Sequence, residues 1–114
     1  MNNVVPTTVL IDARNVQRSK WPNIPDEELV ELAQRWADEH GHRALIVFDG
    51  PAPAGAIGTG SESADDWLTR EAARLAELGE PFWLITSDRE LRERAGSRAE
   101  RVIGGGRFAR ELTT

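Results

Sequence analysis

Three short apolar runs, each followed closely by an aspartate, constrain most strongly what this chain can fold into. Residues 7–11 (TTVLI), 44–48 (ALIVF) and 82–85 (FWLI) are almost continuously apolar and rich in β-branched and aromatic side chains. Strands that are buried on both faces have this composition, because neither face meets water. The runs therefore predict the inner strands of a sheet that is covered on both sides.

Amphipathic segments lie between the apolar runs and predict helices. Residues 26–40 and 64–78 each carry an apolar stripe at helical spacing. Ser63 is a candidate N-cap for the second helix, and Gly41 and Gly79 stand where the two helices should end. Three shorter elements are also expected, namely a strand at 101–103 and helices at 89–95 and 107–112.

The alternation of strands and helices predicts an α/β fold in three layers, with a central, mostly parallel sheet of four to five strands and helices on both faces. A length of 114 residues allows one domain, residues 1–114, and no second domain of ordinary size. Ligands of such folds bind beyond the carboxyl ends of the strands. The glycine- and proline-rich segment 50–60 (GPAPAGAIGTG) is expected to be a mobile loop at that edge.

The composition excludes several classes of protein. The absence of cysteine excludes a disulfide scaffold, a thiolate zinc site and a cysteine nucleophile. The net charge of −5 argues against a protein that coats nucleic acid electrostatically. No apolar run approaches the roughly 20 residues of a membrane span, and residues 1–3 lack the basic start of a secretion signal. We therefore expect a cytoplasmic protein without a membrane partner.

Aspartates follow the ends of all three inner strands. Asp12, Asp49 and Asp88 follow the first, second and third apolar runs, and Asp65 and Asp66 begin the second long helix. In a parallel sheet these five carboxylates should gather at one edge, where they repel one another unless a cation is present. An all-oxygen donor set favours Mg²⁺ or Mn²⁺ over zinc. These five aspartates are therefore the candidate residues of a metal site.

Each of these aspartates also has a purely structural interpretation. Ser63 and Asp66 have the spacing of a capping box, and acidic residues are favoured in the first turn of any helix. Asp88 could cap the helix at 89–95, and Asp49 could belong to a turn. Caps and turns do not require the same residue type at three strand ends, so the joint pattern favours a metal site.

Other polar residues at this edge are candidate substrate contacts. Asn15 could orient Asp12 or a substrate phosphate, or it could simply form a turn. Arg14, Arg18 and Lys20 could contact backbone phosphates, or they could be solvated loop residues. Thr86 and Ser87 could bind near the metal or cap a helix, and Arg89 follows them.

The tryptophans divide into two groups. Trp36, Trp67 and Trp83 lie within predicted helices and strands and are expected in the core. Trp21 stands beside Pro22 in a predicted loop and is the best candidate for an exposed aromatic side chain. An exposed aromatic ring is the kind of surface on which a nucleic acid base can stack.

Four motifs occur in a recognisable order: 11–16 (IDARNV), 47–50 (VFDG), 63–66 (SADD) and 86–91 (TSDREL). Together they resemble the NYN domain of the YacP-like type, a branch of the PIN-like nucleases, over about residues 9–112. The resemblance implies a PIN-like domain that binds Mg²⁺ or Mn²⁺ and cuts RNA endonucleolytically, leaving a 5′-phosphate and a 3′-hydroxyl. It implies that Asp12, Asp65, Asp66 and Asp88 stand at the acidic positions and are catalytic, that Asn15 is the motif asparagine, and that Asp49 ends the second strand. The metal ligands that we expect on this basis are Asp12, Asp49, Asp65 and Asp88.

The resemblance also implies partners. The expected substrate is RNA, either single-stranded or ribosome-associated mRNA, tRNA or rRNA. Because the negative net charge predicts weak unaided binding, a homodimer or a ribosomal partner is expected to supply a basic groove. The alternative is a non-catalytic RNA-binding or ribosome-associated module. A phosphatase is disfavoured because no second aspartate stands two residues after Asp12, and a receiver-like domain because the single lysine, Lys20, lies too early in the chain.

Overall fold

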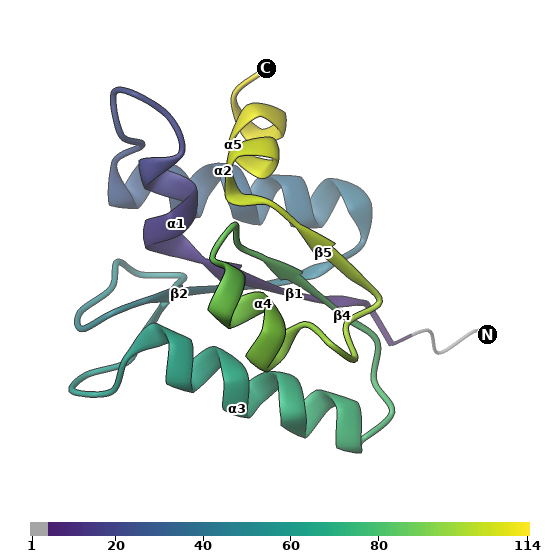
Figure 1. Cartoon of the computed structure of the whole chain (residues 1–114). Helices are drawn as coiled ribbons and strands as arrows, with labels where there is room; N and C mark the ends of the chain where they lie inside the picture. The colour runs from purple at the N-terminus through teal and green to yellow at the C-terminus, as the bar shows by residue number, and fades with distance from the viewer. Residues whose placement is uncertain (1–4) are drawn as a thin grey trace.

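A computed structural model describes residues 5–114. Residues 1–3, for which no secretion signal was expected, lie outside the described part. The described strands and helices follow one another along the chain in this order (Figure 1): β1 (Thr8–Asp12), α1 (Ala13–Arg18), α2 (Asp26–His40), β2 (Arg43–Phe48), β3 (Ile57–Gly58), α3 (Ala64–Glu77), β4 (Phe82–Ile85), α4 (Arg89–Ala95), β5 (Arg101–Ile103) and α5 (Gly105–Thr113). Strands and helices alternate along most of the chain, as the sequence predicts.

The strands form one five-stranded sheet in the order β3-β2-β1-β4-β5. Every pair of neighbouring strands is parallel, and β1 lies in the middle, paired with β2 on one side and β4 on the other. The register places Asp12 opposite Val47 and Ile11 opposite Ile85. The predicted α/β fold is confirmed, and the carboxyl ends of all five strands face the same edge of the sheet.

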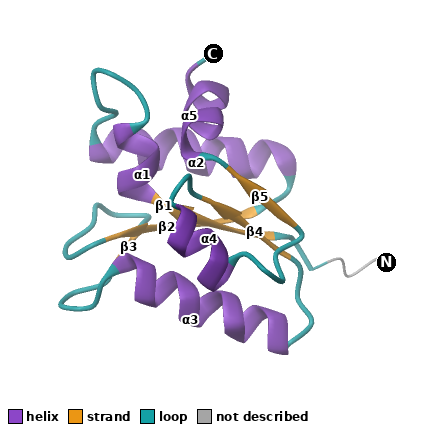
Figure 2. Cartoon of the chain, viewed as in Figure 1, coloured by secondary structure: helices purple, strands orange, loops and turns teal. Residues whose placement is uncertain are grey.

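Helices cover both faces of the sheet (Figure 2). One apolar cluster packs α1, α2 and α5 against side chains such as Ile11 and Ile46, and a second packs α3 and α4 against side chains such as Leu10 and Leu84. Successive residues of β1 thus serve opposite layers, and both are fully buried. Burial of each such side chain contributes about 1.5–3 kcal/mol. This two-sided burial explains why the strands are apolar without alternation.

Two short elements depart from the sequence expectations. Residues 13–18, for which no helix was predicted, form α1, whose side chains Val16 and Gln17 are buried. The amide nitrogen of Gln17 donates to the carbonyl of Ile24, so the helix and the following loop are joined by a buried polar contact. The last helix starts at Gly105 and not at residue 107. Glycine has a low helix propensity, so the three consecutive glycines at 104–106 gave no sign in the sequence that the first turn of α5 begins among them.

The segment 50–60 contains β3, which pairs with the end of β2. Two hydrogen bonds hold the segment on either side of β3. The backbone N–H of Thr59 donates to the carbonyl of Phe48 at 3.2 Å, and the side chain of Gln34 donates to the carbonyl of Gly55 at 3.0 Å. A side chain at Gly58 would collide with the carbonyl of Gly50. Glycine at this position therefore allows the segment to fold closely back on itself.

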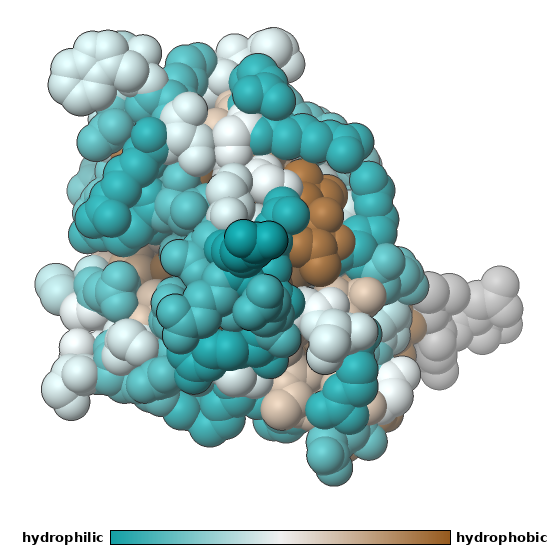
Figure 3. All heavy atoms as spheres, in the orientation of Figure 1, coloured by the Kyte–Doolittle hydropathy of each residue, from teal (hydrophilic) through white to brown (hydrophobic). Residues whose placement is uncertain are grey.

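The surface view in Figure 3 is mostly hydrophilic over α3 and α4. Of the tryptophans, Trp36 is buried and Trp67 and Trp83 are partly buried against the two apolar clusters, whereas Trp21 is 87% exposed. The predicted division of the tryptophans is confirmed. Within residues 5–114, none of the helices has the length and apolar character needed to cross a membrane.

Candidate functional site

Asp12 ends the central strand and is the most buried carboxylate of the carboxyl edge, with 8% of its surface exposed. The pKa of this carboxyl group is raised to about 6, mainly by burial. Hydrogen bonds from the Thr86 side chain and from the backbone N–H of Asn15 lower the pKa and offset part of this effect. The nearby carboxylates of Asp65 and Asp49 raise it further. The buried position and like-charged neighbours thus hold Asp12 in an environment that favours a bound proton or cation.

Thr86 connects Asp12 to the start of α4. Its hydroxyl donates to Oδ2 of Asp12 at 2.9 Å and accepts a hydrogen bond from the backbone N–H of Asp88 at 3.1 Å. The Thr86 side chain is fully buried, and its backbone carbonyl accepts from Nε of Arg92 at 2.8 Å. A single residue directly after β4 therefore sets the orientation of the Asp12 carboxylate.

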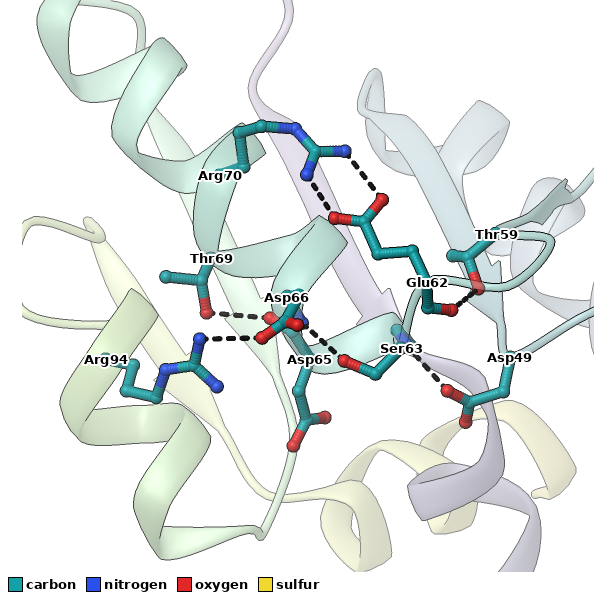
Figure 4. Close-up of polar contacts among 10 residues, drawn as sticks. Asp49, Thr59, Glu62, Ser63, Asp65, Asp66, Thr69, Arg70 and Arg94 are labelled. Atoms are coloured by element: carbon teal, nitrogen blue, oxygen red, sulfur yellow. Dashed lines mark hydrogen bonds and ion pairs between the residues drawn. The ribbon is translucent and has the colours of Figure 1, made fainter.

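Asp49 and Asp65 meet at the amino end of α3. Oδ1 of Asp49 accepts from the backbone N–H of Ala64 at 2.7 Å, so this carboxylate holds the start of the helix against the end of β2 (Figure 4). Burial raises the pKa of Asp65, and the negative charges of Asp88 and Asp49 raise it further. The order of the elements places four carboxylates at the carboxyl edge of the sheet: Asp12 ends β1, Asp49 and Asp88 follow β2 and β4, and Asp65 lies in the first turn of α3.

Asp66 lies apart from this group. Its Oδ1 accepts from Nη2 of Arg94 at 2.9 Å, and this ion pair lowers the pKa of Asp66 (Figure 4). Its backbone N–H donates to Oγ of Ser63, which is the N-cap of α3 as predicted. Adjacent helical residues point about 100° apart, so Asp65 and Asp66 face different neighbours. The structure brings Asp65, but not Asp66, to the shared acidic edge.

Asp88 has a structural contact as well as an electrostatic one. Its Oδ1 accepts from the backbone N–H of Leu91 at 2.8 Å, so it is the N-cap of α4. The structural interpretation of this residue is thus correct. The same carboxylate raises the pKa of Asp65. Capping and membership of the acidic edge are compatible, because the capping contact uses one carboxylate oxygen.

Asn15 and Ser87 build a hydrogen-bonded bridge between α1, the end of β4 and α5. Oδ1 of Asn15 accepts from the backbone N–H of Ser87 at 2.8 Å, and Oγ of Ser87 accepts from the backbone N–H of Gly105 at 2.8 Å. A Cβ at Gly105 would clash with Oδ1 of Asn15. Glycine is therefore required where α5 approaches this bridge.

The three arginines that the sequence predicts as substrate contacts are placed differently. Arg14 donates to Asp26 at 2.8 Å, and its guanidinium lies over the ring of Phe48, 5.0 Å from the ring centroid. Arg18 is exposed at the end of α1, and Arg89 is exposed at the first position of α4. Two of the three side chains are thus open to solvent, and Arg14 is engaged within the fold.

The donor set of the acidic edge consists of carboxylate oxygens, which suits a hard divalent cation. Within residues 5–114, no three Asp, Glu, His or Cys side chains are arranged so that all three could hold one metal ion. Mg²⁺ in proteins usually keeps several waters and uses only one or two carboxylates. The residues present therefore fit a hydrated cation better than a closed cage of protein ligands.

Two residues at this edge were missed by sequence reasoning. Arg92 lies one helical turn after Asp88 and donates to the carbonyl of Thr86, and helical spacing from Asp88 was a usable signal for it. Gln17 is buried and donates to Asp26 at 2.6 Å as well as to Ile24. Nothing in the sequence distinguished Gln17, because its partners become visible only when α1 and the loop before α2 are in place.

No protein-family model and no curated protein matches the chain. A solved structure does match, the crystal structure of a point mutant of Rae1 (YacP) from Bacillus subtilis. The TM-score is 0.76 at 20% sequence identity, and the similarity covers 94% of this chain and 75% of the other. The fold is that of YacP, so the resemblance to YacP-like NYN domains that the motifs indicated is confirmed at the level of the fold.

Proposed function

We propose that this protein is a metal-dependent endoribonuclease that hydrolyses phosphodiester bonds of RNA at the acidic edge of its sheet. The observation that carries the proposal is the placement of four aspartates, Asp12, Asp49, Asp65 and Asp88, at the carboxyl edge of one parallel sheet, where burial and neighbouring carboxylates raise the pKa values of Asp12 and Asp65. Repulsion between neighbouring carboxylates is unfavourable unless a cation is bound. Carboxylates with raised pKa values occur most often at functional sites. The fold shared with YacP and the four sequence motifs support the same activity.

Mg²⁺ or Mn²⁺ is the proposed cofactor. Asp12 and Asp65 would hold it, because Asp12 is buried at the end of β1 and Asp65 lies in the first turn of α3 at the same edge, and Asp49 and Asp88 would lie beside them with one oxygen each bonded to a helix N–H. Such an ion, when bound, activates water and neutralises charge on a phosphodiester. The hydroxyl of Thr86 keeps Oδ2 of Asp12 in a fixed direction, which limits the reorganisation needed on binding.

The proposed substrate contacts surround this edge. Arg18 and Arg89 are exposed, so their guanidinium groups are free to contact phosphates of the RNA. Arg14 is the third proposed phosphate contact, and its side chain is paired with Asp26. Asn15 and Ser87 shape the backbone next to the acidic residues. The net charge of −5 predicts that the chain alone binds RNA weakly. A homodimer or a ribosomal partner would then supply the basic groove that strengthens binding. The proposed substrate is single-stranded or ribosome-associated RNA in the cytoplasm.

A specific observation favours a second candidate function. Three side chains that could hold one ion together are not found among residues 5–114. A non-catalytic RNA-binding or ribosome-associated module with a vestigial acidic edge would have this property. Such a module would retain its RNA affinity after the carboxylates are replaced, and it would show no turnover with any divalent cation.

The experiment that separates the two uses a labelled single-stranded RNA, with Mn²⁺, Mg²⁺ or EDTA. Asp12→Asn keeps an acceptor for Thr86, and Asp88→Asn keeps a good N-cap, so both variants should fold. Asp38→Asn, on the exposed surface of α2, is the matched control. Metal-dependent cutting that both site variants lose and the control keeps supports the nuclease. RNA binding without cutting by the wild type would support the binding module.

A further inference from the structure

Trp21 lies in the loop between α1 and α2, which projects from the body of the molecule (Figure 1). Its side chain is 87% exposed, more than that of any other large apolar residue among residues 5–114. The remaining tryptophans pack against the core. A single exposed apolar residue is ordinary on protein surfaces, so its meaning depends on what surrounds it.

Cationic residues stand close to Trp21 in the sequence. Residues 13–25 contain Arg14, Arg18 and Lys20 and no acidic residue, although the chain as a whole has a net charge of −5. Arg14 is paired with Asp26. Arg18 and Lys20 are exposed, and within the described part of the chain no carboxylate forms an ion pair with either. Arg18 and Lys20 are therefore two exposed cations close to Trp21 in the chain, within a segment that Asp12 and Asp26 flank.

A hollow of about 360 Å³ adjoins the same loop. Its lining includes Arg18, Asn23 and Pro25, and its size lies in the range of small-molecule sites. The wall is braced by the hydrogen bonds from Gln17 to Ile24 and from Arg14 to Asp26, at 2.9 and 2.8 Å. These contacts join α1 to the end of the loop beside the hollow, whose lining also contains Arg14, Gln17 and Asp26.

The segment is close to the acidic edge. The helix α1 starts directly after Asp12 and has six residues, which corresponds to a length of about 9 Å. Arg18 stands at the far end of this helix, and Trp21 follows three residues later. An extended chain that reaches the carboxylates from this side passes the basic segment first.

We infer that the segment formed by Arg18, Lys20 and Trp21 binds single-stranded RNA, with an unpaired base stacked on the indole of Trp21 and the adjoining phosphates held by the two cations. Stacking on an aromatic ring combined with cationic backbone contacts is the general mode of single-strand binding. Duplex RNA keeps its bases stacked inside the helix and cannot use this surface in the same way. The choice of ligand rests on the proposed function, since an acidic site for phosphodiesters needs an RNA strand beside it.

The test measures binding of a fluorescent single-stranded RNA oligonucleotide to the full chain in EDTA, so that no cleavage intervenes. Trp21→Ala is expected to weaken binding about tenfold or more, because each stacked base makes a contribution of this order. Trp21→Phe, which keeps an aromatic face, should stay within a few-fold of the wild type. Leu78→Ala is the control, since Leu78 is also a large exposed apolar residue, at 58%, and lies at the end of α3.

The charged residues have their own readout. Arg18→Gln and Lys20→Gln should each reduce the dependence of log affinity on log salt concentration by about 0.7, the value expected for one lost phosphate contact on a single strand. A duplex of the same sequence should be bound equally by the wild type and by Trp21→Ala. Unchanged single-strand affinity in Trp21→Ala, or no RNA binding by the wild type, would overturn the inference.

The outcomes separate this inference from the proposed nuclease activity. Metal-dependent cutting together with normal RNA affinity in Trp21→Ala overturns the RNA-binding segment alone. Weakened binding in Trp21→Ala, with no cutting by the wild type, supports the segment and contradicts the nuclease. A Trp21→Ala variant that loses self-association in sedimentation while keeping its RNA affinity would show that the loop contacts a second copy of the chain, which also overturns the inference.

Discussion

The hydroxyl of Thr86 donates to Oδ2 of Asp12 at 2.9 Å, a contact between residues 74 positions apart. The same oxygen accepts from the backbone N–H of Asp88, so its single proton is committed to the carboxylate. The pKa of Asp12 is lowered by this contact from what burial alone would give. The ionisation of Asp12 and the start of α4 are therefore coupled through one buried side chain.

Thr86→Val should raise the pKa of Asp12 above its value of about 6, because the carboxylate loses a donor while remaining buried. The backbone N–H of Asp88 loses its acceptor as well. Loss of buried partners of this kind costs about 1–3 kcal/mol. Urea unfolding should show the lost stability, and the pH midpoint of Mn²⁺ binding should move upward. Thr86→Ser, which keeps the hydroxyl, is the control, and equal midpoints for the two variants would contradict the coupling.

Asp12→Asn should stabilise the metal-free protein at neutral pH. The folded-state pKa of about 6 exceeds the ordinary value of 3.8, so the folded protein binds a proton more tightly and stability falls as the pH rises between these values. Above pH 6 the full penalty is present, on the order of 1–3 kcal/mol. The variant should therefore be more stable than the wild type at pH 7.5 and equal to it at pH 4, as thermal unfolding in EDTA can show. A difference of the same size at both pH values would contradict this origin.

Mn²⁺ should stabilise the folded protein without any RNA present. A ligand that binds only the folded state at about 100 times its Kd contributes about 2.7 kcal/mol. We expect the rise in melting temperature to disappear in Asp65→Asn and to persist in Asp66→Asn, because Asp66 is paired with Arg94 and lies apart from the other carboxylates. If the Asp66 variant alone lost the response, the assignment of the metal site would be wrong.

Gly105→Ala should destabilise the protein although alanine is the better helix former. The added Cβ clashes with Oδ1 of Asn15 and breaks the bridge to Ser87, and such overpacking typically costs about 1–3 kcal/mol. Gly106→Ala is the matched control, since its Cβ would meet no heavy atom closer than 3.6 Å. Chemical denaturation of the two variants gives the comparison, and equal stabilities would argue against a close approach at Gly105.

The parts of the fold that the sequence predicts best are those with strong local signals. Residues 26–40, with an apolar stripe and a glycine at the end, form a helix over the predicted range, and α4, β4 and β5 also agree with their expected bounds. The helix α1 lacks such signals, because it has only six residues and no side-chain cap. Its stability comes from the burial of Val16 and from the contacts of Gln17, which exist only in the folded chain.

The acidic edge was predictable for a different reason. An aspartate that follows an inner strand must lie at the carboxyl edge whatever the details of the loops, so Asp12, Asp49 and Asp88 could be assigned from order alone. Their hydrogen-bond partners could not, since these come from distant residues. The pairing of Asp66 with Arg94 depends on how α3 and α4 lie together, and no pattern in either segment specifies it.

Asp49 and Asp88 each have two roles, a contact that stabilises a helix start and a place at the acidic edge, and this affects how the sequence would change in evolution. Each accepts a hydrogen bond from a helix N–H, at Ala64 and Leu91 respectively, so selection for stability alone would preserve both. Burial raises the pKa of Asp12 and makes its charged form unfavourable, so if this protein has the proposed nuclease activity, Asp12 would be replaced soon after that activity was no longer selected. Descendants that have lost the activity should therefore be recognised by a neutral residue at position 12 beside two retained aspartates.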